Sequence, residues 1–159
     1  MNHLFDSGDS VVDDALRQMA RTDSDAALRA QAAFRSLSWG NGLQVVSLRA
    51  LQEFLWFGLP TKWDVPAAEP HEITRALGGL FDRVELGRCA LRCTGSVTAA
   101  VLEAYGRDTD EAGLAVFRHA LEVGGVEPPD IPGLLSFGDI LGEQESARCP
   151  RWPIIWNWR

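Results

Sequence analysis

The sequence predicts an all-α protein, a single-domain bundle of five to seven helices. Apolar residues recur at intervals of three and four along most of the chain, which is the spacing of one helix face. Strand and helix patterns do not alternate, and this disfavours a parallel α/β sheet. The most apolar stretch, about residues 43–59, has the pattern of a buried helix around which we expect the other helices to pack. A length of 159 residues fits one domain with a substantial core.

The stretch 43–59, LQVVSLRALQEFLWFGL, is apolar on nearly all sides when drawn as a helix. Its apolar positions form two helical rows: Val45, Leu48, Leu55 and Leu59, and Val46, Ala50, Phe54 and Phe57. Arg49, Gln52 and Glu53 form the thin polar strip that remains. Because such a helix needs neighbours on nearly all sides, we expect it at the centre of the domain. Its short length and its polar strip argue against a transmembrane span.

Residues 1–9 are expected to form a flexible acidic arm ahead of the first helix. Ser10 is the expected N-cap of that helix, and Asp13, three residues later, completes a box-like start. The apolar face of this helix extends to about residue 21 and consists of Val12, Leu16 and Met19. The helical domain is therefore expected to begin at residue 10, and we expect it to end at residue 147.

A second, alanine-rich helix is expected to follow and to extend to about Leu37. The sequence Thr22-Asp23-Ser24-Asp25 ends one helix and offers two caps for the next. One row of this second helix contains Ala26, Ala30, Ala33 and Leu37, and such small side chains allow another helix to approach closely. Residues 39–42, WGNG, predict a tight turn that leads into the central helix.

Three prolines predict a loop over residues 60–70, since Pro60 and Pro66 disfavour a helix there. Pro70 fits the first turn of the next helix. The apolar stripe of that helix consists of Ile73, Leu77, Leu80, Phe81 and Val84. Gly78 and Gly79 lie in its middle, where each glycine costs about 1 kcal/mol relative to alanine. We therefore expect another element to cross closely at this point.

A longer helical row follows, and its continuity is left open by the sequence. The row consists of Leu86, Cys89, Cys93, Val97, Ala100 and Ala104. The sequence Thr94-Gly95-Ser96 is able to break this helix in two, with Ser96 as a new cap. A further helix is expected on the buried positions Leu114, Phe117 and Leu121, and a short last helix over residues 133–145.

The formal net charge of −7 limits the classes of partner. The last twelve residues carry three arginines and no acid, so residues 1–147 carry −10. An acidic body repels phosphate backbones, and this argues against a nucleic-acid binder; it suits a basic protein partner. The N-terminus has no apolar signal sequence, and three cysteines at no framework spacing indicate reduced thiols. A cytoplasmic location is the resulting expectation.

The sequence offers few residues for catalysis, and no cofactor is predicted. It contains no phosphate loop, HExxH or GxSxG motif. Cys89 and Cys93 share a helix face and could share a metal, but common zinc motifs use another spacing, and small hydrophobic packing explains both residues. His71 with the carboxylates of Glu69 and Glu72 is the nearest approach to an acid–base cluster. His119 is expected to be solvated.

The tail 148–159, RCPRWPIIWNWR, is the most unusual stretch of the chain. Its candidate contact residues are Arg151, Trp152, Trp156 and Trp158. The tail either folds back on the helical body or docks on another subunit or partner, because Trp and Arg dominate interface energetics. A contact with a membrane surface is the less favoured alternative. Trp56 falls on the polar strip of the central helix, near Trp63, which indicates a second packed layer or a contact surface.

We therefore expect a non-enzymatic cytosolic interaction protein, acting as a regulator, adaptor or inhibitor. Its contact surfaces would be an acidic helical body and the Trp/Arg-rich tail, and its partner another protein or a second copy. The alternative is a small helical enzyme or a ligand- or metal-binding protein with an interhelical site near His71, Glu72, Cys89 and Cys93. A helical DNA-binding regulator would need a basic helix face, and Arg75 and Arg83 are the only basic residues on their helix.

Overall fold

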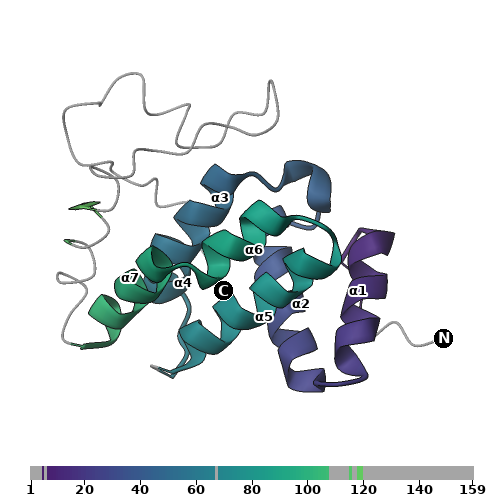
Figure 1. The fold of residues 1–159 in the computed structure, drawn as a ribbon, viewed down its shortest axis with the longest axis horizontal. Helices are drawn as coiled ribbons and strands as arrows, with labels where there is room; N and C mark the ends of the chain where they lie inside the picture. Colours follow the sequence, from purple (N-terminus) through teal and green to yellow (C-terminus); the bar gives the residue numbers. More distant parts are fainter. Residues whose placement is uncertain (1–4, 6, 67, 108–114, 116–117, 120–159) are drawn as a thin grey trace.

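The computed structural model describes residues 5, 7–66, 68–107, 115, 118 and 119. Within this part of the chain the regular structure is helical and contains no strand, which confirms the predicted all-α class (Figure 1). The α-helices are α1 (Ser10–Ala20), α2 (Ser24–Ser38), α3 (Leu48–Glu53), α4 (Leu59–Lys62), α5 (Glu69–Arg83), α6 (Gly87–Thr94) and α7 (Ser96–Arg107). A 3-10 turn, Leu43–Val45, precedes α3, and a π-helical turn, Phe54–Gly58, joins α3 to α4.

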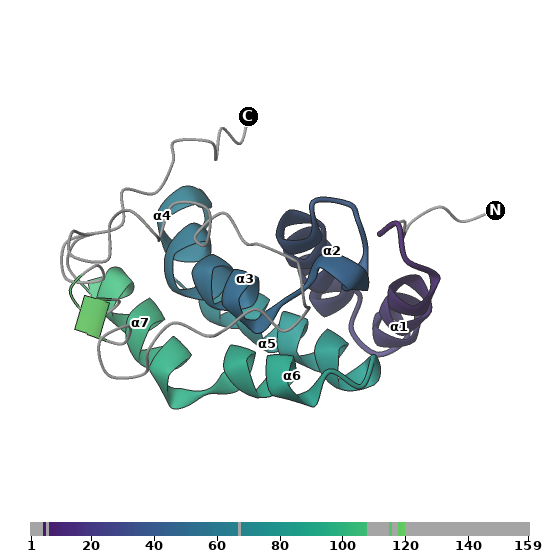
Figure 2. The ribbon, with the colours of Figure 1, turned by 90° about the horizontal axis from the view of Figure 1, so that it is seen from above.

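Helix α5 contacts other helices on several sides. It packs against α2 and α6 along its length, and it also contacts α1 and α7. In Figure 2, α6 and α7 follow one another along one edge of the molecule, and α1 and α2 lie together at one end. The shared core is apolar and includes Val12, Leu16, Phe34, Leu51, Leu55, Leu77, Leu80 and Phe81.

The predicted helix over residues 43–59 is buried as expected, but its bounds are wrong. It begins at Leu48, because the Ser47 side chain caps it by accepting a 3.0 Å hydrogen bond from the Ala50 amide. It then continues past the predicted stop at Pro60 as far as Lys62. The π-helical turn explains this continuation, since the Leu59 amide donates to the Phe54 carbonyl five residues back. The wider turn leaves room for a proline ring that an α-helix would exclude.

Within the predicted N-terminal arm, residues 1–9, the structure describes Phe5 and residues 7–9. Ser7 is buried, and its amide donates a 2.8 Å hydrogen bond to Asp13 Oδ1. Asp9, rather than the predicted Ser10, caps α1, because its Oδ1 accepts from the amides of Val11 and Val12. Its second oxygen accepts a 3.1 Å hydrogen bond from the Leu43 amide. Asp9 therefore connects the start of α1 to the segment before α3.

The turn predicted between the second helix and the central stretch is confirmed. Helix α2 is capped by Asp23, whose side chain accepts from the Ala26 amide. Trp39 ends it in a left-handed conformation with φ of 54°, and Gly40 follows with φ of 75°. Gly8 also has positive φ, and a Cβ atom there would lie 2.7 Å from the Gly40 carbonyl oxygen. The turn thus packs closely on the residues that precede α1.

The helix break that the sequence left open occurs at Gly95. This residue is extended, with ψ of 155°, and Ser96 is the first residue of α7. The break interrupts the helical phase, so the predicted buried row does not continue into α7. Thr98, Val101 and Leu102 are buried there, whereas Val97 is exposed. Ala100, which was also predicted in the buried row, is exposed.

Most of the predicted features after residue 107 lie outside the described residues. They include the predicted helices around residues 114–121 and 133–145 and the tail 148–159. Ala115, Arg118 and His119 are described, and all three are helical and exposed. Over the described ranges, no helix combines the length and the apolar character that crossing a membrane requires.

Candidate functional site

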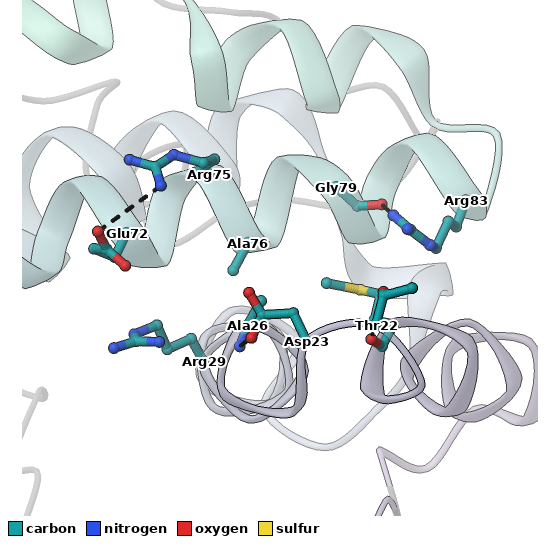
Figure 3. Close-up of a pocket in the computed structure, with 10 residues that line it drawn as sticks. Thr22, Asp23, Ala26, Arg29, Glu72, Arg75, Ala76, Gly79 and Arg83 are labelled. Carbon is teal, nitrogen blue, oxygen red and sulfur yellow. Dashed lines mark hydrogen bonds and ion pairs between the residues drawn. The ribbon is translucent and has the colours of Figure 1, made fainter.

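A half-open pocket of about 190 Å³ lies between α2 and α5 (Figure 3). Helix α5 supplies one wall, and α2, with the end of α1 and the residues between α1 and α2, supplies the other. Its lining consists of Met19, Thr22, Asp23, Ala26, Arg29, Glu72, Arg75, Ala76, Gly79 and Arg83. Figure 3 shows Ala26 and Ala76 across from each other, so small side chains form the middle of the pocket and charged ones surround them.

Three arginines extend from α2 and α5 around Ala26 and Ala76. Arg29 Nε donates a 2.5 Å hydrogen bond to Glu69 Oε1, and this bond is the main reason that the pKa of Arg29 lies above its ordinary value. Arg75 Nη1 lies 3.8 Å from Glu72 Oε1, a loose ion pair in which the Arg75 side chain is 72% exposed. Arg83 Nη1 donates a 2.8 Å hydrogen bond to the Gly79 carbonyl.

The two glycines of α5 differ in what lies next to them. A Cβ atom on Gly78 would lie 3.2 Å from Cys93 Cβ and 3.2 Å from Thr94 Cγ2, so α6 crosses α5 there. The close crossing predicted from the sequence is therefore confirmed at Gly78. A Cβ atom on Gly79 would lie 3.5 Å from Arg83 Nη1, an ordinary contact distance. Gly79 faces the pocket rather than a packed helix.

The four residues of the alternative predicted site are divided between different places. Glu72 lines the α2–α5 pocket. Cys89 and Cys93 are buried in α6, where Cys93 adjoins Gly78. His71 is half-buried in the first turn of α5, and its carbonyl accepts from Thr74 Oγ1. Among the described residues, no group of three or more His, Cys, Asp or Glu side chains is arranged to hold a metal ion.

Burial dominates the chemistry of the Cys93 thiol. The side chain is 2% exposed, and burial raises the pKa of this thiol far above its ordinary value. The Asp82 carboxylate, and Cys89 when it is a thiolate, raise the pKa of Cys93 further by repulsion between like charges. Because the thiolate is the nucleophile and metal ligand, a thiol that stays protonated is unreactive. The packing role predicted for this cysteine fits its surroundings.

Trp56 lies in a second packed layer, which is one of the two alternatives that the sequence left open. It is 2% exposed, and its Nε1 donates a 2.9 Å hydrogen bond to Thr98 Oγ1 of α7. The Arg92 guanidinium of α6 lies over the Trp56 ring at 5.5 Å. Thr98 Oγ1 in turn donates to the Arg92 carbonyl at 2.7 Å. Helices α6 and α7 therefore supply the packing partners of Trp56.

The other predicted contact residues are only partly described. Trp63 is half-buried and packs edge-on against Phe54, with ring centroids 5.8 Å apart. The tail residues Arg151, Trp152, Trp156 and Trp158 lie outside the described residues. Their predicted role in an interface remains a prediction.

A surface that the sequence did not predict lies on the outside of α6 and α7. We call it the α6–α7 outer face and define it by Arg88, Leu91, Val97 and Ala100. Leu91 is 72% exposed and Val97 is 44% exposed, although both are apolar. The signal for this surface was Gly95, because an extended residue there turns Val97 away from the core. Comparisons with protein-family models, curated proteins and solved structures find no match for the chain.

Proposed function

We propose that this chain is a non-enzymatic, cytosolic protein–protein interaction module that pairs with a second copy of itself through the α6–α7 outer face. The observation that carries the proposal is the exposure of Leu91, the most exposed large apolar side chain among the described residues. Clustered apolar side chains on a surface typically mark a contact site. Val97, which follows the helix break, is a second exposed apolar side chain.

The distribution of charge supports a second copy as the partner. Residues 7–107 hold twelve acidic and eleven basic side chains, a formal charge of −1. Residues 108–147 hold nine acidic side chains and one basic one, a formal charge of −8. The predicted acidic body is therefore acidic mainly beyond residue 107. Between residues 86 and 102 the only charged side chains are Arg88 and Arg92, and Arg88 belongs to the α6–α7 outer face. We expect Arg88 to attract the acidic residues 108–147 of a second copy.

The tail 148–159 would add to the same contact. It carries a formal charge of +3 and the residues Arg151, Trp152, Trp156 and Trp158. Trp and Arg are the residues whose truncation most often weakens an interface. The proposal therefore has two parts, an outer face on the helical body and a tail, and they are separable by experiment.

Light scattering after size exclusion tests the proposal on the full chain over a wide range of protein concentrations. We expect the parent chain to self-associate and Leu91→Asp to remain monomeric. Leu28→Asp is the matched control, because Leu28 is also an exposed leucine but lies on α2, away from the outer face. A parent chain that is monomeric at every concentration overturns the proposal, and so does Leu91→Asp that self-associates like Leu28→Asp.

A second chain, ending at Ala147, tests the contribution of the tail. Loss of self-association in this truncated chain, with unchanged thermal stability, would add the tail to the interface. A truncated chain that self-associates like the parent would remove the tail from the proposed contact. A loss of thermal stability without a change of association would assign the tail to the core of one copy.

A further inference from the structure

We propose that two dimers of this chain join into a tetramer through an antiparallel contact between the exposed faces of α2 helices from different copies. This inference rests on the self-association proposed above and adds a second contact to it. The contact surface is the α2 stripe, which we define by Asp25, Leu28, Ala32, Arg35 and Trp39. Figure 2 shows α5 between α2 and α6, so the α2 stripe and the α6–α7 outer face are separate surfaces of one copy.

The first observation is that α2 has an exposed face that carries apolar side chains. Helix α2 packs against α1 and α5. The residues of the α2 stripe follow one another at intervals of three and four, which places them along one face of the helix, and all of them are exposed. Leu28 is 48% exposed and Trp39 is 54% exposed. Such intervals are typical of a helix that pairs with another helix.

The second observation is that the order of side chains along the α2 stripe is complementary to itself. In an antiparallel pair of α2 helices centred at the level of residue 30, position 25 of one copy lies opposite position 35 of the other, and position 28 lies opposite position 32. Asp25 then meets Arg35 of the second copy, and the large Leu28 meets the small Ala32. The two-fold symmetry repeats both contacts.

This complementarity also selects the second copy as the partner and the antiparallel direction. In the antiparallel pair, both charged positions meet the opposite charge. In a parallel pair, each Asp25 would lie beside another Asp25 and each Arg35 beside another Arg35, and like charges repel. A second copy therefore supplies every group that the α2 stripe requires, without any other partner.

The third observation is the conformation of Trp39. This residue ends α2 in the left-handed region, with φ of 54°, where glycine is the usual residue. A residue that has a Cβ atom is strained in this region. Trp39 therefore adds both backbone strain and exposed apolar area to a single copy. Because tryptophan is among the residues that dominate interface energetics, contact with a second copy offsets both costs.

The α2 stripe is too short to hold two copies together by itself. It extends over about two heptads, whereas coiled-coil pairing is typically sustained over three or four. When two dimers join, two α2 contacts form, and the second of them is intramolecular. A tetramer is the smallest closed assembly in which every copy uses both kinds of contact. Leu91→Asp, which removes the α6–α7 contact, is therefore expected to lose the α2 contact as well.

Sedimentation velocity of the full chain over a wide range of concentrations tests this proposal. We expect the parent chain to form dimers and then tetramers, and Leu28→Asp to stop at dimers. A parent chain that stops at dimers at every concentration overturns this inference and leaves the α6–α7 contact in place, and so does Leu28→Asp that forms tetramers like the parent. A parent chain that stays monomeric overturns the proposed function together with this inference.

Exchange of the two charges tests the antiparallel pairing. Asp25→Arg places arginine opposite arginine, and Arg35→Asp places aspartate opposite aspartate. We expect each single variant to weaken the association of dimers by about tenfold or more, because like charges then face each other. The double variant, Asp25→Arg with Arg35→Asp, restores opposite charges at the parent net charge and should form tetramers again. Single variants that associate like the parent overturn the proposal, and so does a double variant that stops at dimers.

Trp39→Gly separates the contact from the stability of one copy. Glycine adopts positive φ without strain, so we expect a higher thermal midpoint, yet an association of dimers that is weaker by about tenfold. Glu85→Gly is the matched control, since Glu85 is also exposed, with φ of 61°, but follows α5. This control should raise the midpoint and leave the tetramer unchanged. Equal association of dimers in the two variants overturns the proposal.

Discussion

The two faces of α5 differ although adjacent glycines lie on them. On the α6 face, Gly78 allows the Cys93 and Thr94 side chains to approach within 3.2 Å of where its Cβ would be. On the α2 face, Gly79 lines an open pocket. Both glycines impose the same local cost on the helix, but only Gly78 is required by packing. The local sequence therefore determines how much a glycine destabilises its helix. Whether the glycine also improves packing depends on the element that lies against it.

The two faces also differ in chemistry. The α6 face is apolar, with Cys89, Ala90 and Cys93 buried against α5. The α2 face carries ionic groups, including the bond between Arg29 and Glu69. A closely packed apolar face is destabilised by a change in side-chain volume, whereas a charged and partly open face accommodates one. Four predictions, in order of decreasing effect, test this contrast.

The largest effect is expected from leucine at the two glycine positions. Gly78→Leu should lower the free energy of unfolding by about 3 kcal/mol, because a large side chain must displace α6. Gly79→Leu should lower it by less than about 1 kcal/mol, because its side chain enters the pocket. Urea denaturation of both variants measures the difference. Equal destabilisation would mean that the two faces are packed alike.

The second largest effect is expected at the hydrogen bond between Trp56 and Thr98 of α7. Thr98→Val removes the acceptor of the Trp56 Nε1 hydrogen bond and leaves a buried donor unpaired. We expect a loss of about 2 kcal/mol in the free energy of unfolding. Thr94→Val is the matched control, since Thr94 is exposed, and it should cost less than about 0.5 kcal/mol. Chemical denaturation that gives similar losses for both threonines would contradict the importance of this bond.

The third prediction concerns the pH dependence of stability that Cys93, on the apolar α6 face, contributes. Because burial raises the pKa of Cys93 in the folded chain, only the unfolded thiol ionises when pH rises above about 8.5. The contribution of Cys93 to stability is complete below that pH and should fall by about 1.4 kcal/mol for each further pH unit. Denaturation at neutral and alkaline pH measures this slope. Cys93→Ala should have the shallower slope, and identical slopes in parent and variant would refute the prediction.

The smallest effect is a gain in stability. Gly79→Ala should raise the free energy of unfolding by about 0.5–1 kcal/mol, because alanine suits a helix and meets no close neighbour. Thermal and urea denaturation both report this change. Gly78→Ala is the control and should lack the gain, since its methyl group meets Cys93. A destabilised Gly79→Ala would indicate that the α2 face is tighter than the distances imply.

Apolar periodicity was sufficient to predict the helical class and most helices, because each helix buries one stripe. Helix ends were less predictable, since tertiary contacts select among several capping residues. Asp9 and Ser10 are both good caps, and Asp9 also binds the Leu43 amide, 34 residues away. The π-helical turn before Pro60 likewise leaves no pattern in the spacing of apolar residues.

The candidate site was harder to predict than the fold. The lining of the pocket combines residues 19–29 with residues 72–83, and no local pattern connects the two segments. The burial of Trp56 was better indicated, because a tryptophan on a polar strip requires a partner. The α6–α7 outer face was missed, since the phase of α7 depends on the conformation of Gly95.

The π-helical turn at Phe54–Gly58 also restricts the evolution of this chain. Such a turn corresponds to one extra residue in an α-helix. Deleting one residue there would restore an ordinary α-helical turn and keep the side chains before and after it in phase. It would also bring the ring of Pro60 against a carbonyl one turn earlier. We therefore expect descendants of this protein to keep the length of this segment, or to lose the extra residue and Pro60 together.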